Sequence, residues 1–142
     1  MENIIFRAFL KEEKMMCDVA AINFYMGNVV LLARDTTQVE YFTRKNKEVF
    51  INDLYNRLSV SKDSVEVMPY VGINDINNKL IFVGDIIKCN FYGKKEVIGV
   101  VDIDCGCAYL KWSSVSDNQL FAFENLEVIG NIYENPELLN LN

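Results

Sequence analysis

Two neighbouring cysteines and two neighbouring aspartates are the residues of this chain whose type and spacing could do chemistry. Cys105 and Cys107 flank a single glycine, and two thiols this close together can bind a metal ion or exchange a disulfide. A protein zinc site normally has four ligands, however, and this sequence contains no histidine and no second closely spaced cysteine pair. We therefore favour a structural role for the pair, with a metal or redox role as the alternative.

The aspartates, Asp102 and Asp104, stand two apart in a predicted strand, so their carboxylates share one face. Paired carboxylates can perform acid–base chemistry or hold a cation. Val101 and Ile103 point to the opposite face, which is the alternation of a strand with one buried and one solvated side. We interpret the acids as part of the solvated side.

The sequence lacks the residues that usually activate a nucleophile and the glycine pattern that usually forms a phosphate-binding loop. Without histidine, the Ser-His-Asp and Cys-His arrangements are closed to this sequence. A serine–lysine dyad stays open, although the companion motifs of the known enzymes do not all occur. The 7 glycines are scattered singly, so they build neither a phosphate loop nor a dinucleotide fingerprint. We expect a protein that is not an enzyme and that uses no cofactor and no metal.

Two groups of side chains could contact nucleic acid. The cluster Arg44-Lys45-Lys47 could bind phosphate or an acidic partner, but we favour a solvated helix entrance. Five aromatic residues of the second half could form a stacking platform, but we favour core packing for them: Tyr92, Tyr109, Trp112, Phe121 and Phe123.

The charge distribution argues against nucleic acid as the main partner. The net charge is −6, and residues 72–142 carry 5 Lys/Arg against 10 Asp/Glu, whereas residues 1–71 carry 9 against 10. Nucleic-acid affinity comes largely from clustered Lys and Arg that neutralise phosphates, and an acidic half cannot supply them.

The length of 142 residues and the 51% of hydrophobic residues fit one domain, or two small subdomains, with a sizeable core. The apolar runs are shorter than the roughly 20 residues that span a bilayer, and we identify no signal peptide. We therefore expect no membrane partner, reduced cysteines, and a protein that stays in the compartment where it is made.

The hydrophobic pattern predicts an α+β fold that is predominantly β. Residues 1–71 are predicted to form an N-terminal α+β subdomain with a β-hairpin, in which the runs 19–25 and 29–32 are joined at Met26-Gly27-Asn28. Helical spacing of apolar residues predicts one main helix over 46–59, with Asn46 as its N-cap.

Residues 72–142 are predicted to form a C-terminal β subdomain with a short tail. Short β runs at 85–91, 97–104, 108–112, 120–123 and 126–133 indicate a small SH3-like barrel or a curved antiparallel sheet. Gly130-Asn131 interrupts the last run, which indicates a β-bulge, and Pro136 is expected to begin a helical turn.

Two segments also match a known family. Residues 127–139 contain Gly130-Asn131-Ile132-Tyr133-Glu134-Asn135-Pro136, and residues 70–87 contain Tyr70-Val71-Gly72 and Gly84-Asp85-Ile86-Ile87. Both resemble the YopX-like family of phage and prophage proteins, and Arg7-Ala8 resembles the family's opening more weakly. Gly84-Asp85-Ile86-Ile87-Lys88 is also similar to SH3-like barrel proteins.

The resemblance implies a small phage or prophage protein in the cytoplasm of a bacterial host, whose molecular role is not established. We interpret its motif residues as structural: Tyr70, Gly72, Gly84, Asp85, Gly130, Asn131, Tyr133, Glu134, Asn135 and Pro136. The functional hypothesis is a non-enzymatic module that binds a phage or host protein and forms homo-oligomers. The alternative is a nucleic-acid-associated regulator that uses the basic segment Arg44–Lys47.

Overall fold

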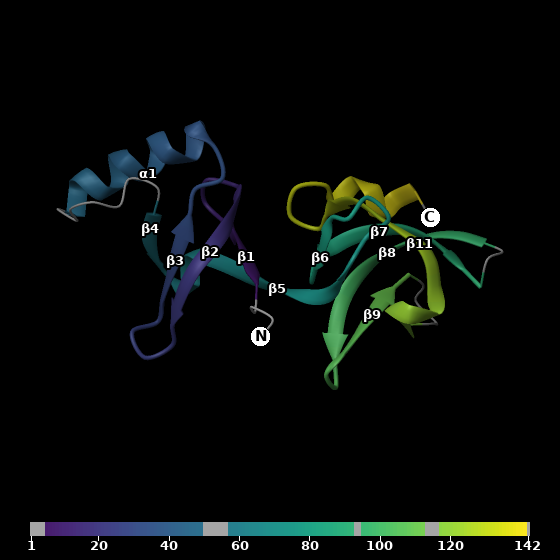
Figure 1. Ribbon diagram of the computed structural model, residues 1–142. Helices are drawn as coiled ribbons and strands as arrows, with labels where there is room; N and C mark the ends of the chain where they lie inside the picture. The colour runs from purple at the N-terminus through teal and green to yellow at the C-terminus, as the bar shows by residue number, and fades with distance from the viewer. Residues whose placement is uncertain (1–4, 50–56, 93–94, 113–116, 142) are drawn as a thin grey trace. The chain divides into compact units, whose positions relative to one another are not determined.

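The computed structural model describes residues 5–49, 57–92, 95–112 and 117–141 (Figure 1). It confirms a predominantly β α+β fold with one α-helix and antiparallel sheets. The chain divides into two compact units, Met1–Val67 and Met68–Asn142, so the division falls within strand β5 (Val65–Asn74). No helix among the described residues is long and apolar enough to cross a membrane.

The first unit is a sheet covered by the helix. Its strands lie in the order β4-β3-β2-β1 and continue to the start of β5. Helix α1 lies across one face of this sheet in Figure 1, and its Phe42 is completely buried in the core. The elements are β1 (Phe6–Leu10), β2 (Met15–Asn23), β3 (Asn28–Leu32), α1 (Thr36–Val49), β4 (Arg57–Ser61) and the 3₁₀ turn η1 (Lys62–Ser64).

The predicted position of the helix is wrong. Helix α1 begins at Thr36, so Asn46 lies inside it, and the predicted helical residues 57–59 belong to strand β4; residues 50–56 lie outside the described part of the chain. The start signal is Asp35, whose carboxylate accepts a hydrogen bond from the N–H of Gln38 at 2.9 Å, as an N-cap does. Buried Leu58 produced the helical spacing, although it packs into the same core from a strand.

The predicted hairpin is confirmed, but its turn is longer than the sequence suggested. β2 ends at Asn23, which pairs with Asn28, so Phe24 and Tyr25 belong to the turn and not to the strand. The Asn23 side chain accepts a hydrogen bond from the N–H of Met26 at 2.9 Å, and its carbonyl accepts one from Gly27 at 2.8 Å.

The second unit contains an open five-stranded antiparallel sheet in the order β10-β9-β8-β7-β11. Its end strands β10 and β11 do not pair with each other among the described residues. The predicted curved antiparallel sheet is therefore confirmed, and the alternative prediction of a closed SH3-like barrel is wrong. The elements are the rest of β5, β6 (Leu80–Phe82), β7 (Asp85–Phe91), β8 (Lys95–Asp104), β9 (Cys107–Lys111), β10 (Asp117–Gln119), η2 (Leu120–Ala122), β11 (Phe123–Asn131) and η3 (Pro136–Leu141).

A buried aspartate fastens the loop between β5 and β6 to strand β11. Oδ1 of Asp75 accepts hydrogen bonds from the N–H groups of Asn77 at 2.8 Å and Lys79 at 2.9 Å. Its Oδ2 accepts one from Val128 at 3.0 Å. Burial alone would raise the pKa of Asp75, but these backbone donors outweigh it and hold the pKa below the usual range of an aspartate.

We predict that Asp75→Asn lowers the free energy of unfolding by about 1–3 kcal/mol at pH 7, because an amide cannot accept at both oxygen positions. A depressed pKa stabilises the fold above the pKa of the unfolded state, and this stabilisation is lost as pH falls through the folded-state pKa. The difference between the two proteins should therefore shrink between pH 5 and pH 2.

Urea unfolding across this pH range measures the effect, and Asp104→Asn, at an exposed position, is the matched control. Equal stability of Asp75→Asn and wild type at pH 7 would contradict this role.

Candidate functional site

The C-terminal family motif is a turn that its own side chains close. Asn131 is buried, and its Oδ1 accepts hydrogen bonds from the N–H groups of Tyr133 at 3.0 Å and Glu134 at 2.9 Å. Its Nδ2 donates to Oε1 of Glu134 at 2.9 Å. The bulge predicted here is confirmed by a register shift between Val128 and Gly130. The strand ends at Asn131, however, so the prediction that it continues to Tyr133 is wrong: the Asn131 side chain binds the next amides in place of a strand partner.

Gly130 makes room for the second asparagine of the motif. Oδ1 of Asn135 accepts a hydrogen bond from the N–H of Asn131 at 3.2 Å, and the N–H of Asn135 donates to the carbonyl of Asn131 at 2.9 Å. A Cβ at residue 130 would lie 2.6 Å from that Oδ1, a distance that no side chain can adopt. Pro136 then begins the 3₁₀ helix η3, as predicted.

The upstream motif meets this turn inside the second unit. Asp85 pairs with Asn131 in the β7–β11 register, and the N–H of Ile132 donates to the carbonyl of Gly84 at 2.9 Å. Gly84 has φ +90° and Asp85 is 1% exposed, with its Oδ2 accepting from the N–H of Phe82 at 2.8 Å.

Tyr70 and Gly72 lie apart from that junction, on β5. Tyr70 pairs with Phe82 of β6, and its hydroxyl donates to Asn74 at 2.7 Å. Gly72 has φ +92° and open space around its Cα, so backbone conformation is what favours glycine there. The hydrogen bonds of the motif residues thus lie within the fold, which supports their structural interpretation.

Of the four cysteines, Cys105 and Cys107 are exposed at the β8–β9 hairpin. Cys105 and Gly106, with φ of +51° and +77°, form the two-residue turn between the paired residues Asp104 and Cys107. Among the described residues, no group of three or more His, Cys, Asp and Glu side chains is placed to hold a metal ion.

The remaining cysteines and the paired acids have other surroundings. Burial raises the pKa of Cys17 to about 11 and that of Cys89 to about 12, which keeps both thiols protonated and unreactive at neutral pH. Asp102 forms an ion pair with Lys111, with Nζ and Oδ2 3.1 Å apart, and accepts a hydrogen bond from the Tyr109 hydroxyl at 3.4 Å. Both partners of Asp102 therefore lie on the neighbouring strand β9.

The aromatic residues of the second unit do not form one flat platform. The rings of Phe91, Trp112 and Phe123 pack together, with centroids 5.3 Å apart for Phe91–Trp112 and 5.4 Å for Phe91–Phe123. Phe123 is buried, whereas Phe121 is 84% and Tyr92 66% exposed. Core packing therefore accounts for part of the predicted set, and Phe121 and Tyr92 lie on the surface.

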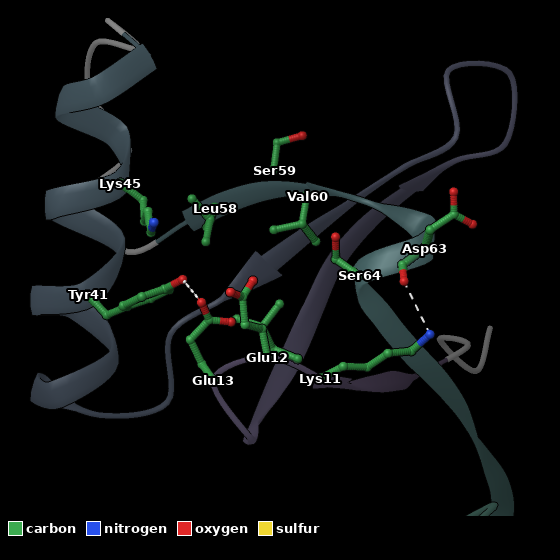
Figure 2. A pocket seen from close by; sticks show the side chains of 11 residues that line it. Lys11, Glu12, Glu13, Tyr41, Lys45, Leu58, Ser59, Val60, Asp63 and Ser64 are labelled. Carbon is green, nitrogen blue, oxygen red and sulfur yellow. Dashed lines mark hydrogen bonds between the residues drawn. The ribbon is translucent and has the colours of Figure 1, made fainter.

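Lys45 of the basic segment lines a pocket of about 500 Å³ between helix α1 and strand β4 (Figure 2), whereas Arg44 lines a different pocket along α1; the side chain of Lys47 lies outside the described set. Tyr41 donates a hydrogen bond from its hydroxyl to Glu13 at 2.6 Å, and burial together with Glu13 raises the pKa of Tyr41. The guanidinium carbon of Arg44 and Nζ of Lys45 each lie 5.8 Å from the Tyr41 ring centre. Among the charged residues that line the pocket, Lys11 and Lys45 face three acids, Glu12, Glu13 and Asp63, so it does not favour phosphate.

A serine–lysine spacing does occur in the chain, at Ser59 and Lys62. Ser59, on β4, lines the pocket beside Tyr41, whereas Lys62, in η1, lines a different pocket next to the β2–β3 hairpin. The two side chains therefore line different pockets of the described part of the chain.

Among the described residues of the first unit, the most exposed large apolar side chains lie at the turn of the β2–β3 hairpin. Phe24 is 88%, Tyr25 97% and Met26 64% exposed. A pocket of about 280 Å³ lies beside this turn, and most of its wall is apolar. This surface was not predicted from the sequence, although one signal was present: residues 19–33 contain no charged side chain.

Three comparisons with known proteins give a family and a fold. A model of the family described as YopX protein matches residues 5–140. Two crystal structures are similar over nearly their full length: protein yopX from Bacillus subtilis (TM-score 0.60, 16% identity, 97% of each chain) and protein EF1440 from Enterococcus faecalis (TM-score 0.58, 18% identity, 98% of this chain and 99% of that one). No curated protein matches the chain.

The close contact between Gly130 and Asn135 gives a testable coupling. We predict that Gly130→Ala lowers the free energy of unfolding by about 1–3 kcal/mol, because the added Cβ forces the Asn135 side chain out of place. Asn135→Ala should also destabilise, since the N–H of Asn131 loses its acceptor.

The double variant should be less destabilised than the sum of the two single changes, because each change disrupts the same contact. Chemical denaturation of all four proteins measures this. Strict additivity would show that the glycine and the asparagine act independently.

Proposed function

The chain belongs to the YopX protein family, and from that premise we propose that it is a non-enzymatic module that binds another protein or assembles with itself. The observation that carries the proposal is the apolar turn at Phe24, Tyr25 and Met26, which lies in solvent next to an apolar pocket. Contiguous exposed apolar surface is typical of interaction sites, and aromatic side chains and methionine are enriched in interfaces.

We further propose that the protein is a phage or prophage product, that it acts in the cytoplasm of a bacterial host, and that its partner is a phage or host protein. Two observations support this proposal. The chain matches the YopX family, which it also resembles in its sequence motifs, and the two similar structures come from bacteria. At 16–18% identity these structures support the fold only, so the role itself rests on the surface of this chain.

Binding through the hairpin can be tested by removing its apolar side chains. We expect the triple variant Phe24→Ser, Tyr25→Ser, Met26→Ser to fold like the wild type, because all three side chains are mostly exposed. When immobilised, the triple variant should no longer bind the protein that the immobilised wild type captures, whether that protein is a bacterial partner or a further copy of the chain.

Phe121→Ser is the matched control, since Phe121 is an equally exposed phenylalanine of the other unit, at 84%. Quantitative affinity capture from bacterial extract, together with sedimentation of the purified protein, gives the comparison. The proposal fails if wild type and the triple variant behave alike in both measurements.

The alternative proposal, a nucleic-acid-associated regulator, depends on Arg44 and Lys45. We predict that duplex DNA binds no more tightly than the roughly 10⁻⁴–10⁻⁶ M of non-specific contact at physiological salt. Titration of fluorescent DNA at two salt concentrations measures this, with Arg44→Glu, Lys45→Glu as the comparison. A submicromolar, salt-sensitive complex that this double variant abolishes would reverse the ranking of the two functions.

A further inference from the structure

The β2–β3 hairpin carries both a protrusion and a pocket. The protrusion is the pair Tyr25 and Met26 at the turn. The pocket lies beside it and is lined by apolar residues of β1, the hairpin itself and the start of β5, namely Phe6, Ile22, Phe24, Val29 and Val67. Asn23, Gly27, Asn28 and one charged residue, Lys62, complete its lining. A single surface of the first unit therefore offers an apolar projection next to an apolar hollow.

The turn is held in place before any partner arrives. Asn23 accepts two hydrogen bonds from the turn, from the N–H groups of Met26 and Gly27. The carbonyl of Gly27 accepts a third, at 2.8 Å, from the N–H of Lys62, which ties the turn to η1. A projection fixed in this way loses little conformational entropy on binding.

The pocket suits a protein side chain. Its volume of about 280 Å³ lies below the roughly 300–1,000 Å³ of small-molecule sites. Its apolar wall offers few polar groups to orient a substrate, whereas an aromatic or methionine side chain needs only apolar contact. The occupant that fits is therefore an apolar side chain presented by a protein.

Charge allows a second copy of the chain to be the source of that side chain, provided that the two copies meet through the first unit. Residues 68–142 carry 5 Lys/Arg against 10 Asp/Glu, so two copies that met through this unit would repel each other. Residues 1–67 carry 9 against 10, and residues 19–33 carry no charge.

Lys62 is the single cation among the residues that line the pocket beside the hairpin, which is fewer than a lipid surface would need. The first charged residues on either side of the uncharged stretch, Asp18 and Arg34, neutralise each other in an ion pair at 2.8 Å. A membrane-binding surface would instead be expected to present free Lys and Arg towards anionic lipids.

We propose that this hairpin is a two-fold self-docking surface, in which Tyr25 and Met26 of each copy enter the apolar pocket of the other. A two-fold interface uses the same patch on both copies, so the patch must be complementary to itself. A projection and a hollow side by side meet that requirement. The inference rests on the proposed function, because it names the partner of the same surface.

Removing the projection should weaken dimer formation. Sedimentation velocity of the wild type over a range of concentrations should show a monomer–dimer equilibrium. Tyr25→Ser, Met26→Ser should raise its dissociation constant by roughly tenfold or more, as expected for apolar anchors, and Phe121→Ser should leave it unchanged. Circular dichroism checks that each variant is folded.

A mixing experiment tests whether the projection of one copy enters the pocket of the other. Val67→Trp fills the pocket and should also prevent association, with Ile22→Trp as the substitute if that protein does not fold. The Tyr25→Ser, Met26→Ser variant keeps its pocket, and Val67→Trp keeps its projection. An equimolar mixture should therefore form a heterodimer with one intact contact, whereas neither protein alone dimerises at that concentration.

The other occupants give different outcomes. A wild type that stays monomeric at all concentrations overturns self-docking, and so does turn-dependent binding to phospholipid vesicles containing phosphatidylserine. A monomeric wild type that retains a different protein through the turn overturns self-docking but leaves the proposed function standing. If neither a second copy nor a different protein binds through the turn, both proposals fail.

Discussion

Pairing of backbone N–H groups where strands end or bulge is the constraint on which the second unit depends. Short strands create many such places, and a buried unpaired N–H costs about as much as a lost hydrogen bond. In this protein, aspartate and asparagine side chains accept those bonds in place of a neighbouring strand. Asp75 accepts from three amides and Asn131 from two, and the side chains of Asp85 and Asn135 also accept from backbone amides.

The same constraint gives the family motif a physical meaning. Gly130 is needed because Asn135 must approach the backbone closely, and Gly84 because the turn before Asp85 has a positive φ. Apolar core residues can be exchanged for others of similar volume, whereas a carboxylate or amide that binds specific N–H groups has few substitutes. These motif side chains are engaged in hydrogen bonds within the fold, so we place the proposed interaction surface elsewhere.

Local chemistry explains how much of the structure could be predicted from the sequence. The bulge at Gly130, the start of η3 at Pro136 and the β2–β3 hairpin follow from residues with strong backbone preferences, and all three are present. The helix was predicted over 46–59 because the apolar spacing and Asn46 as a possible N-cap both indicated that range, whereas the observed N-cap is Asp35. The exposed turn was missed because phenylalanine and tyrosine favour strands, and only the Asn23 hydrogen bonds show that the strand has already ended.

The two units therefore use their unusual residues differently. In the second unit, the residues that break the strand pattern are engaged in hydrogen bonds that hold the fold together. In the first, Phe24, Tyr25 and Met26 occupy a turn that asparagine or glycine would form at least as well, and they bury little of their surface. Exposed aromatic side chains add nothing to the stability of an isolated chain and promote aggregation. The proposed bound state, in which this surface is covered, would account for their presence, and this is the physical reason to test for function in the hairpin rather than in the family motif.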